Sequence, residues 1–376
     1  MADAPDPAAI DEDRIARLRL IRSANVGPVT YHQLLLRFRD ARAALDALPD
    51  LARRGGGREI RIAGRAEVER EVARVAALGA RYLFRGLGRY PARLAEIESA
   101  PPALIVRGRI ALIERPAVAM VGARNASAGA IRFARQLAHE LAEAGALVVS
   151  GLARGIDAAA HAGALDGGTA AVIAGGIDIV YPPENADLQA AIAERGLLIA
   201  EQPPGLEPRA RHFPYRNRII AGTSAGTVVV EAAPKSGSLI TARYAADFGR
   251  EVMAVPGSPL DPRAQGCNLL IREGATLVQS ATDIMEALRP IADGVAVPGR
   301  GYAGPPVSAD ASDAERGAVA GLLGPVAVPV DEIIRLTGLP PAIVQTVLLE
   351  LELAGRLERH AGNRISLSDR PVPQNR

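Results

Sequence analysis

The sequence predicts an α/β protein built on a doubly wound, mostly parallel sheet, with a smaller domain on either side of it. Between residues 66 and 289, short apolar runs alternate with amphipathic helical stretches. Several of these runs are apolar at every position, which is typical of parallel strands that helices cover on both faces. The length of 376 residues is enough for two or three domains.

Residues 1–65 are predicted to form the first domain, which is helical. Ile15 and Leu18 follow a helical spacing, and the sequence Asn-Val-Gly-Pro at 25–28 is typical of a turn between helices. Residues 11–65 contain twelve arginines against seven acidic residues, a net charge of +5. This charge is compatible with contacts to a nucleic-acid backbone.

Residues 66–289 are predicted to hold the sheet. The strand candidates are 117–121, 147–150, 170–174, 197–200, 227–232, 252–255 and 276–278. Amphipathic helices fit between them, for example at 129–143 and 239–248. Repeated strand–helix units of this kind favour a doubly wound sheet.

Residues 290–310 are rich in Pro, Gly and Ala and are predicted to be a linker, and 311–376 to be a winged-helix domain of three helices and a short hairpin. One face of its third helix, 340–353, is apolar and consists of Ile343, Val344, Val347, Leu348 and Leu351. The same helix carries Glu350 and Glu352 and no arginine. We therefore expect an interaction or regulatory module rather than a reader of the DNA major groove.

The composition excludes several classes of protein. No run of about 18 apolar residues is present and the acidic N-terminus lacks an apolar stretch, so neither a membrane span nor a secretory signal is predicted. A single cysteine, Cys267, excludes an intramolecular disulfide and a cysteine-built zinc site, and the five histidines show no ligand spacing. We expect a soluble, cytoplasmic chain without a metal or cofactor. Of 44 basic residues only Lys235 is a lysine, and the net charge is +2.

Two loops after neighbouring predicted strands share small residues, one arginine and a helix start. The residues concerned are Gly122, Arg124 and Ser127 in the first loop and Ser150, Gly151 and Arg154 in the second. Ligands of doubly wound sheets bind beyond the carboxyl ends of the strands, where helix starts offer N–H groups to anions. The alternative for the first loop is a tight turn in which Ser127 only caps the helix.

The most basic segment, 204–218, contains four arginines and one acidic residue, with aromatic residues between the arginines. The candidate binding residues are Arg209, Arg211, Phe213, Arg216, Asn217 and Arg218. Guanidinium groups for phosphates and rings for bases are typical of a platform for single-stranded nucleic acid. The alternative is a solvated basic loop that Phe213 and Pro214 anchor to the core.

A further helix start follows the strand candidate at 227–232. Its candidate anion ligands are Lys235, Ser236, Gly237, Ser238 and Thr241. Serine hydroxyls and free N–H groups at a helix start suit an anion, but plain helix capping by the serines explains them equally well.

Signatures of catalysis are missing from the sequence. Neither G-x-S-x-G nor G-x-x-x-x-G-K-[ST] occurs, and the candidate carboxylates Asp157, Asp178 and Glu231 have no pairing by spacing. We therefore expect no catalytic residues and no enzymatic activity.

Seven short motifs occur in a fixed order along about 140 residues. They are Val-Gly-Ala-Arg (121–124), Ser-Gly-x-x-x-Gly-Ile-Asp (150–157), Tyr-Pro-Pro-Glu-Asn (181–185), Phe-Pro-x-Arg-Asn-Arg-Ile-Ile (213–220), Val-Val-Glu-Ala (229–232), Lys-Ser-Gly-Ser-Leu-Ile-Thr-Ala (235–242) and Gly-Arg-Glu-Val-x-Ala-Val-Pro-Gly (249–257). With these motifs the sequence resembles the DNA-processing protein A (DprA/Smf) family.

The resemblance implies an extended Rossmann fold that binds single-stranded DNA, forms homodimers and loads the recombinase RecA during transformation and recombination, without a cofactor. It implies a SAM- or HhH-like N-terminal domain and a DML1-like winged helix. By this resemblance, the family's strand-binding arginine corresponds to Arg124, and its phosphate-binding loop corresponds to Ser150 and Gly151. The family's basic–aromatic segment corresponds to Arg211, Phe213, Arg216, Asn217 and Arg218. The chain departs from the family pattern at Ala123, commonly a serine, and at His212, often an asparagine.

Two other functions fit parts of the sequence. A nucleotide phosphoribohydrolase of the lysine-decarboxylase-like group carries a Gly-Thr-x-x-Glu element; here 226–231 has one residue too many and the preceding Pro-Gly-Gly is missing. A duplex-binding regulator that acts through the winged helix conflicts with the acidic third helix.

Overall fold

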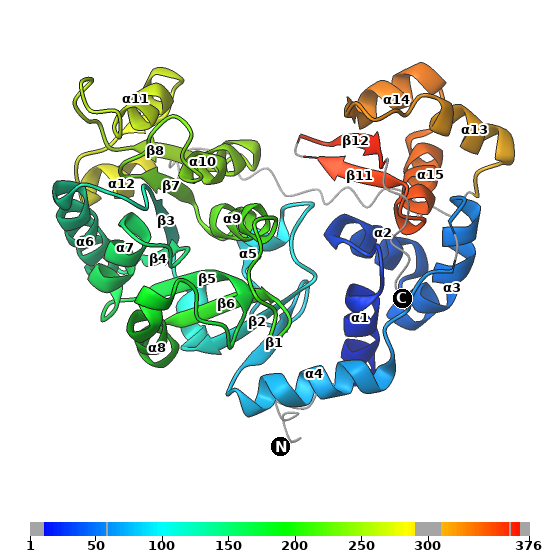
Figure 1. Cartoon of the computed structure of the whole chain (residues 1–376), viewed down its shortest axis with the longest axis horizontal. Coiled ribbons are helices and arrows are strands. Elements are labelled where there is room, and N and C mark those ends of the chain that lie inside the picture. Colours follow the sequence, from blue (N-terminus) through cyan, green and yellow to red (C-terminus); the bar gives the residue numbers. More distant parts are fainter. Residues whose placement is uncertain (1–10, 58, 290–309, 361, 369–376) are drawn as a thin grey trace. The chain divides into compact units, whose positions relative to one another are not determined.

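The computed structural model describes residues 11–57, 59–289, 310–360 and 362–368. The chain forms two compact units, of which one is built from its two ends, 1–72 and 296–376, and the other from 73–295 (Figure 1). The predicted linker, 290–310, lies almost wholly outside the described residues. Among the described helices, none has the length and apolar character that a membrane crossing requires.

A nine-stranded sheet forms the centre of the second unit, in the order β1-β2-β6-β5-β4-β3-β7-β8-β9. The strands are β1 (Arg81–Phe84), β2 (Ala103–Gly108), β3 (Ala117–Val121), β4 (Leu147–Ser150), β5 (Thr169–Gly176), β6 (Leu197–Gln202), β7 (Gly226–Val229), β8 (Glu251–Ala254) and β9 (Thr276–Leu277). The strands β6, β5, β4, β3, β7, β8 and β9 run parallel to one another. At the other end of the order, β1 and β2 add an antiparallel edge.

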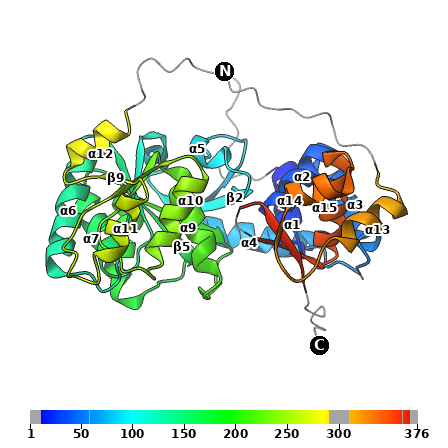
Figure 2. The same ribbon diagram turned by 90° about the horizontal axis from the view of Figure 1, so that it is seen from above.

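Helices cover both faces of this sheet (Figures 1 and 2). One face packs against α6 (Ala128–Glu143), α7 (Ile156–Ala164), α8 (Ala186–Arg195) and α12 (Ala281–Ala287). The other face packs against α5 (Ala92–Ala95), η1 (Ile110–Glu114), α9 (His212–Thr223), α10 (Ser238–Asp247) and α11 (Gln265–Arg272). Because β3 and β4 are buried along their whole length, their sequences are apolar rather than alternating.

The end unit combines three N-terminal helices with the winged helix. The helices are α1 (Glu12–Arg22), α2 (Pro28–Phe38) and α3 (Ala41–Arg54), and α4 (Arg65–Ala77) follows them. The winged helix consists of α13 (Asp313–Gly321), β10 (Val328–Pro329), α14 (Val330–Thr337), α15 (Pro341–Leu353), β11 (Leu357–His360) and β12 (Arg364–Leu367). Its strands form an antiparallel sheet in the order β10-β12-β11.

The predicted fold class is confirmed: a doubly wound, mostly parallel sheet is accompanied by an N-terminal helical domain and a winged helix. The sequence analysis did not propose the edge strands β1 and β2. The apolar sequence Ala-Leu-Ile-Val at 103–106, which is buried in β2, was the signal from which this edge could have been predicted.

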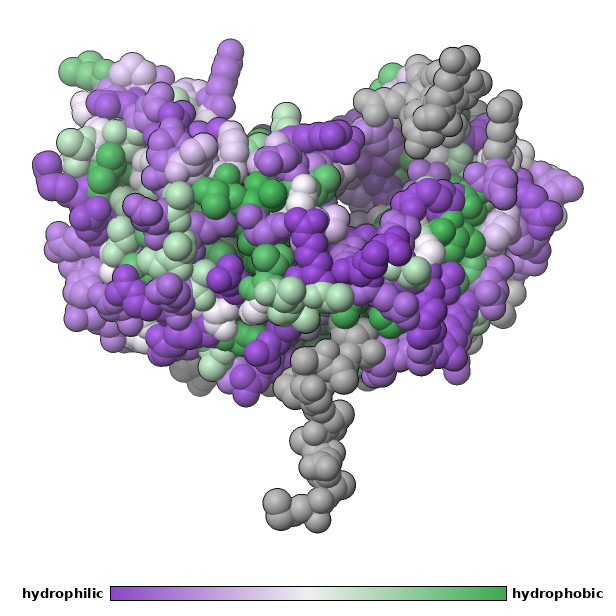
Figure 3. Space-filling view, turned by 60° about the horizontal axis from the view of Figure 1, so that its bottom comes forward, coloured by the Kyte–Doolittle hydropathy of each residue, from purple (hydrophilic) through white to green (hydrophobic). Residues whose placement is uncertain are grey.

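Hydrophilic side chains are interspersed with small apolar areas on the face drawn in Figure 3.

Candidate nucleic-acid interface

A cavity of about 260 Å³ opens where β3, β4 and β5 end. Its lining comes from the end of β5, from the loops after these strands and from the first turns of α9: Arg124, Gly151, Leu152, Ala153, Arg154, Ile173, Ala174, Tyr181, Pro182, Pro183, Glu184, Phe213 and Arg216. The carboxyl ends of parallel strands are the usual ligand-binding edge of a doubly wound sheet. Of the predicted residues, Arg124, Gly151, Arg154, Phe213 and Arg216 therefore meet at one site.

The ring of Phe213 is the centre of this site. The guanidinium carbons of Arg124 and Arg216 lie 5.4 and 5.9 Å from its centroid, within the range of cation–π attraction. The ring of Tyr181, 44% exposed, lies 5.7 Å away and is tilted against it. Two rings and two guanidinium groups are thus gathered on one wall of the cavity.

Arg216 is buried beside Asp157, with 3.7 Å between Nη1 and Oδ2. Burial raises the pKa of Asp157 and lowers that of Arg216, and each charge partly opposes the shift of the other. Gly151 makes room for the arginine, because a Cβ atom there would lie 1.0 Å from Nη1. The Nε of Arg216 is buried and has no hydrogen-bond partner among the described residues.

The backbone of the loop after β4 is committed to α7. The N–H groups of Gly151 and Ala153 donate to Asp157 Oδ2 at 3.2 and 3.4 Å, and that of Leu152 donates to His161 Nε2 at 3.3 Å. These three N–H groups therefore already have acceptors inside the protein. The loop gives the cavity its shape, whereas its positive charge comes from arginine side chains.

His161 supports this loop as a neutral imidazole. Burial, with a further effect of Arg216, lowers its pKa to about 3. Because Nε2 accepts from Leu152, Nδ1 carries the proton and donates to Thr169 Oγ1, 2.7 Å away. Leu152 has a φ of 54°, in the left-handed region that disfavours L side chains, so its hydrogen bond holds a strained position.

The rim of the cavity carries exposed charges. Arg124 is exposed, and Arg154 is 54% exposed at 3.7 Å from Glu184. Glu184 belongs to the Tyr-Pro-Pro-Glu-Asn motif, which supported the family resemblance but contributed no predicted site residue. That motif was the signal from which Tyr181, Pro182, Pro183 and Glu184 could have been found.

Three predicted residues of the first two loops have structural contacts. Gly122 packs against Ile156, Ser127 caps α6 through the N–H of Ala130, and the buried Ser150 hydroxyl donates to the carbonyl of Met120 at 2.6 Å. None of the three lines the cavity. Their roles in binding stay predictions.

The basic segment divides between surface and interior. Arg209 and Arg211 are exposed at the start of α9, and Asn217 is buried with its amide 3.4 Å from the carbonyl of Gly237. Arg218 is buried, paired with Glu201 at 2.5 Å and bonded to the carbonyl of Ser99. Its charge is therefore neutralised away from the cavity lining.

The predicted residues at 235–241 lie at the start of α10. The hydroxyls of Ser236 and Ser238 contact each other at 2.7 Å, Thr241 is buried, and Lys235 and Gly237 are exposed. None of the five lines the cavity.

A second cavity of about 230 Å³ lies beyond β7 and β8. Glu231 and Asp261 are among its lining residues, so its charge disfavours phosphate. The carboxylate of Glu231 accepts from the N–H and the hydroxyl of Ser127 at 3.0 and 2.7 Å. Glu231, the acid of the Gly-Thr-Val-Val-Val-Glu element at 226–231, is thus bonded to the N-cap of α6. In the described part of the chain, no three His, Cys, Asp or Glu residues are grouped to hold a metal ion.

Fold and site together define a Rossmann-type protein with an arginine- and aromatic-lined cavity at its strand ends. A family model described as "DNA recombination-mediator protein A" matches residues 81–289. The chain belongs to this family, which confirms the resemblance. Residues 11–73 match a DprA-like N-terminal HHH domain and 303–363 a DprA winged helix domain.

Named relatives agree with this family. DNA processing protein DprA of Streptococcus pneumoniae is 46% identical over 198 residues, which are 52% of this chain and 70% of the relative. Protein Smf of Escherichia coli is 38% identical over 74% of this chain and 75% of its own. The match to protein Smf of Synechocystis, 44% identical, spans about half of each chain, 53% and 52%.

Two solved structures are similar to this one. The X-ray structure of DprA from Streptococcus pneumoniae has a TM-score of 0.59 and 36% identity, and covers 74% of this chain and 98% of that one. A structure of DNA processing protein A from Helicobacter pylori has a TM-score of 0.51 and 28% identity, covering 55% and 95%, and is described in terms of its single-stranded DNA binding mode.

Proposed function

We propose that this protein binds single-stranded DNA at the cavity beyond β3 to β5, without enzymatic chemistry, and passes the strand to a RecA-type recombinase. The observation that carries the proposal is the ring of Phe213, which the guanidinium groups of Arg124 and Arg216 both approach within about 6 Å. The Helicobacter pylori relative, described as a single-strand binder, supports it.

The exposed cations account for affinity. Arg124 and Arg154 stand at the rim, where a guanidinium group is able to contact successive phosphates and release their counterions. With the amides of 151–153 already bonded to α7, phosphate contacts fall to side chains. Affinity should then fall steeply with salt.

The rings account for preference for unpaired bases. A base that is free of its partner is able to stack on Tyr181, whose ring is 44% exposed, next to Phe213. Stacking is available to every base, so we expect little sequence preference. A duplex keeps its bases inside and offers only its backbone to this site.

The remaining parts of the proposal concern partners and location. We infer a cytoplasmic protein that forms homodimers through its Rossmann domain and acts in transformation or recombination. Light scattering of the purified chain tests the dimer. The rate at which RecA assembles on single strands coated by a single-strand binding protein, with and without this chain, tests the transfer.

Replacing Arg124 with alanine tests the site. We expect weaker binding to single strands of any sequence and a shallower salt dependence, by about 0.7 in the log–log slope for each lost phosphate contact. Arg107→Ala is the matched control, since Arg107 is exposed on β2 opposite the start of β6, at the other edge of the sheet. Equal losses in the two variants would place binding elsewhere.

A further inference from the structure

The winged helix contains a helix-turn-helix pair, α14 and α15. In proteins that read DNA with such a pair, the second helix lies in the major groove and its side chains contact base edges. α15 (Pro341–Leu353) holds this position here. What covers α15 therefore decides whether the domain is able to read a duplex.

Two different cores bury α15. Val344, Val347 and Leu348 belong to the core of the winged helix. Leu349 and Leu353 belong to the core of the N-terminal helices, with residues of α1, α2 and α3. A helix that reads DNA leaves one side free, whereas α15 is packed against α2 and α3 on that side.

Two glycines bring the backbones of the two domains into contact. A Cβ atom on Gly55, the C-cap of α3, would lie 2.0 Å from the carbonyl oxygen of Glu350. A Cβ atom on Gly57 would lie 2.7 Å from the Cα of Ala354. Approach this close leaves no room for any side chain and identifies a packed joint rather than a loose contact.

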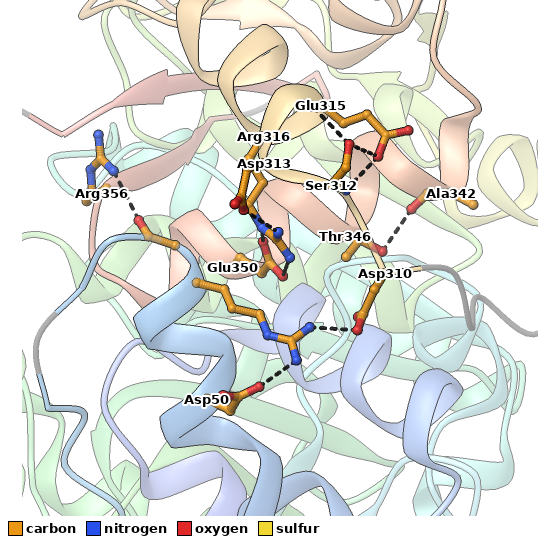
Figure 4. A network of polar contacts seen from close by, with 12 residues as sticks. Asp50, Asp310, Ser312, Asp313, Glu315, Arg316, Ala342, Thr346, Glu350 and Arg356 are labelled. Carbon is orange, nitrogen blue, oxygen red and sulfur yellow. Dashed lines mark hydrogen bonds and ion pairs between the residues drawn. The ribbon is translucent and has the colours of Figure 1, made fainter.

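Ion pairs and hydrogen bonds close the edge of the joint (Figure 4). Asp310, which precedes α13 and is labelled in Figure 4, pairs with Arg54 at 2.8 Å. It also accepts a hydrogen bond from Arg37 at 2.6 Å. These two arginines of α2 and α3 lower the pKa of Asp310. Arg356, which follows α15, donates to the carbonyl of Gly55 at 3.1 Å.

The turn between α1 and α2 is covered by the same helix. The side-chain amide of Asn25 donates to the carbonyl of Leu353 at 3.0 Å. Glu352 Oε1 lies 3.7 Å from the position of a Cβ on Gly27, the N-cap of α2. The other oxygen of this carboxylate, Oε2, accepts from Arg359 Nε at 2.8 Å, so Glu352 is held by the winged helix where it covers the turn.

We propose that α15 is the docking helix that joins the winged helix to the N-terminal helices of the same chain, and that neither side of this joint binds duplex DNA. The partner of α15 is protein, because its apolar side chains are divided between the two cores and its two glutamates are paired with Arg316 and Arg359. The proposal is independent of the single-strand site, which belongs to the other unit.

Cross-linking tests the joint in the full-length chain. Gln33 and Gln345 form a side-chain hydrogen bond of 2.9 Å across it. In a Gln33→Cys/Gln345→Cys variant we expect a short bis-maleimide reagent to link the two positions in most molecules. Single-cysteine variants and the parent chain, whose Cys267 is buried, are the controls. A natively folded double variant that does not cross-link overturns the proposal.

Duplex binding distinguishes docking from masking. We expect the cross-linked and free forms to bind a blunt duplex with the same affinity. If cross-linking weakens duplex binding by about threefold or more, α15 reads DNA when it is released, and the proposal is wrong.

A charge reversal supplies a test without cysteines. Asp310→Arg places a cation against Arg37 and Arg54, so we expect faster hydrogen exchange in α15. Adding Arg37→Asp and Arg54→Asp should restore the slow exchange. Exchange that is unchanged in the first variant, or not restored in the second, contradicts docking through this joint.

Discussion

Two arginines that bind a buried carboxylate differ in how completely their own donors are used. In the end unit, Arg316 binds Glu350 through two hydrogen bonds of 2.8 and 3.0 Å, a bidentate geometry (Figure 4). In the cavity, Arg216 approaches Asp157 only to 3.7 Å and keeps an unpartnered Nε. The first pair completes a structure, whereas the second leaves donor capacity beside exposed rings.

The contrast teaches that pairing, rather than the number of arginines, distinguishes the proposed binding region from the other basic segment. Net charges of +5 at 11–65 and +3 at 204–218 single out two basic segments. In the first, arginines such as Arg22 and Arg37 pair with acids of their own unit. The cavity, by contrast, combines exposed cations with two neighbouring rings. The predictions below test this difference, from the largest expected effect to the smallest.

Removing the acid of the cavity pair should have the largest effect. Asp157→Ala leaves Arg216 buried without its counter-ion and frees the N–H groups of Gly151 and Ala153, so we expect a loss of about 3–5 kcal/mol in stability. Urea denaturation followed by circular dichroism measures it. Asp166→Ala, which breaks the exposed pair with Arg195, is the control and should cost less than about 1 kcal/mol. Similar losses of stability in the two variants would show that the buried cavity pair contributes no more than an exposed pair.

Removing the central ring should weaken binding without unfolding the protein. Phe213→Ala removes the surface that two guanidinium groups face, and we expect single-strand binding to weaken by about 1–3 kcal/mol. Tyr215→Ala is the matched control, because Tyr215 is exposed on the same helix but does not line the cavity. Fluorescence anisotropy measures both. A larger loss from Tyr215→Ala would move the platform to the outer face of α9.

Acid should weaken the cavity scaffold through His161. Its folded-state pKa of about 3 lies below the ordinary 6.5, so between these values the unfolded chain binds more protons. Stability therefore falls as the pH drops through this window, by at most about 1.4 kcal/mol per pH unit. Denaturation midpoints at several pH values measure it. His161→Gln should remove this component, and His139→Gln, at an exposed position, should retain it.

Changing the lone lysine should have the smallest effect. Lys235 is exposed before α10 and does not line the cavity, so Lys235→Arg should alter single-strand affinity less than about twofold. Titrations at low salt give the greatest sensitivity. A clear loss would extend the binding surface from the cavity to the start of α10.

Much of the fold follows from local sequence pattern. The candidates 117–121 and 147–150 coincide with β3 and β4, because strands buried on both faces leave an uninterrupted apolar run. Helix 129–143 differs from α6 by one residue at its start. The rule that ligands bind where parallel strands end also predicted that Arg124 and Phe213 lie at one cleft, and both line the cavity.

Other features depend on contacts that no local pattern encodes. Arg216 and Arg218 stand two residues apart in one motif, yet one faces the cavity and the other is neutralised by Glu201. The hydrogen bond from the Gly151 N–H to Asp157 forms because the first turn of α7 places that carboxylate beside the loop. Docking of α15 joins segments that lie at opposite ends of the sequence.

That joint has a consequence for synthesis on the ribosome. Asn25 and Leu353 are bonded across a separation of 328 residues, and the whole sheet unit is encoded between them. The N-terminal helices therefore emerge first but bury their apolar side against α15 only when translation is nearly complete. The sheet unit has all its strands well before then, so the segment made first completes its core last.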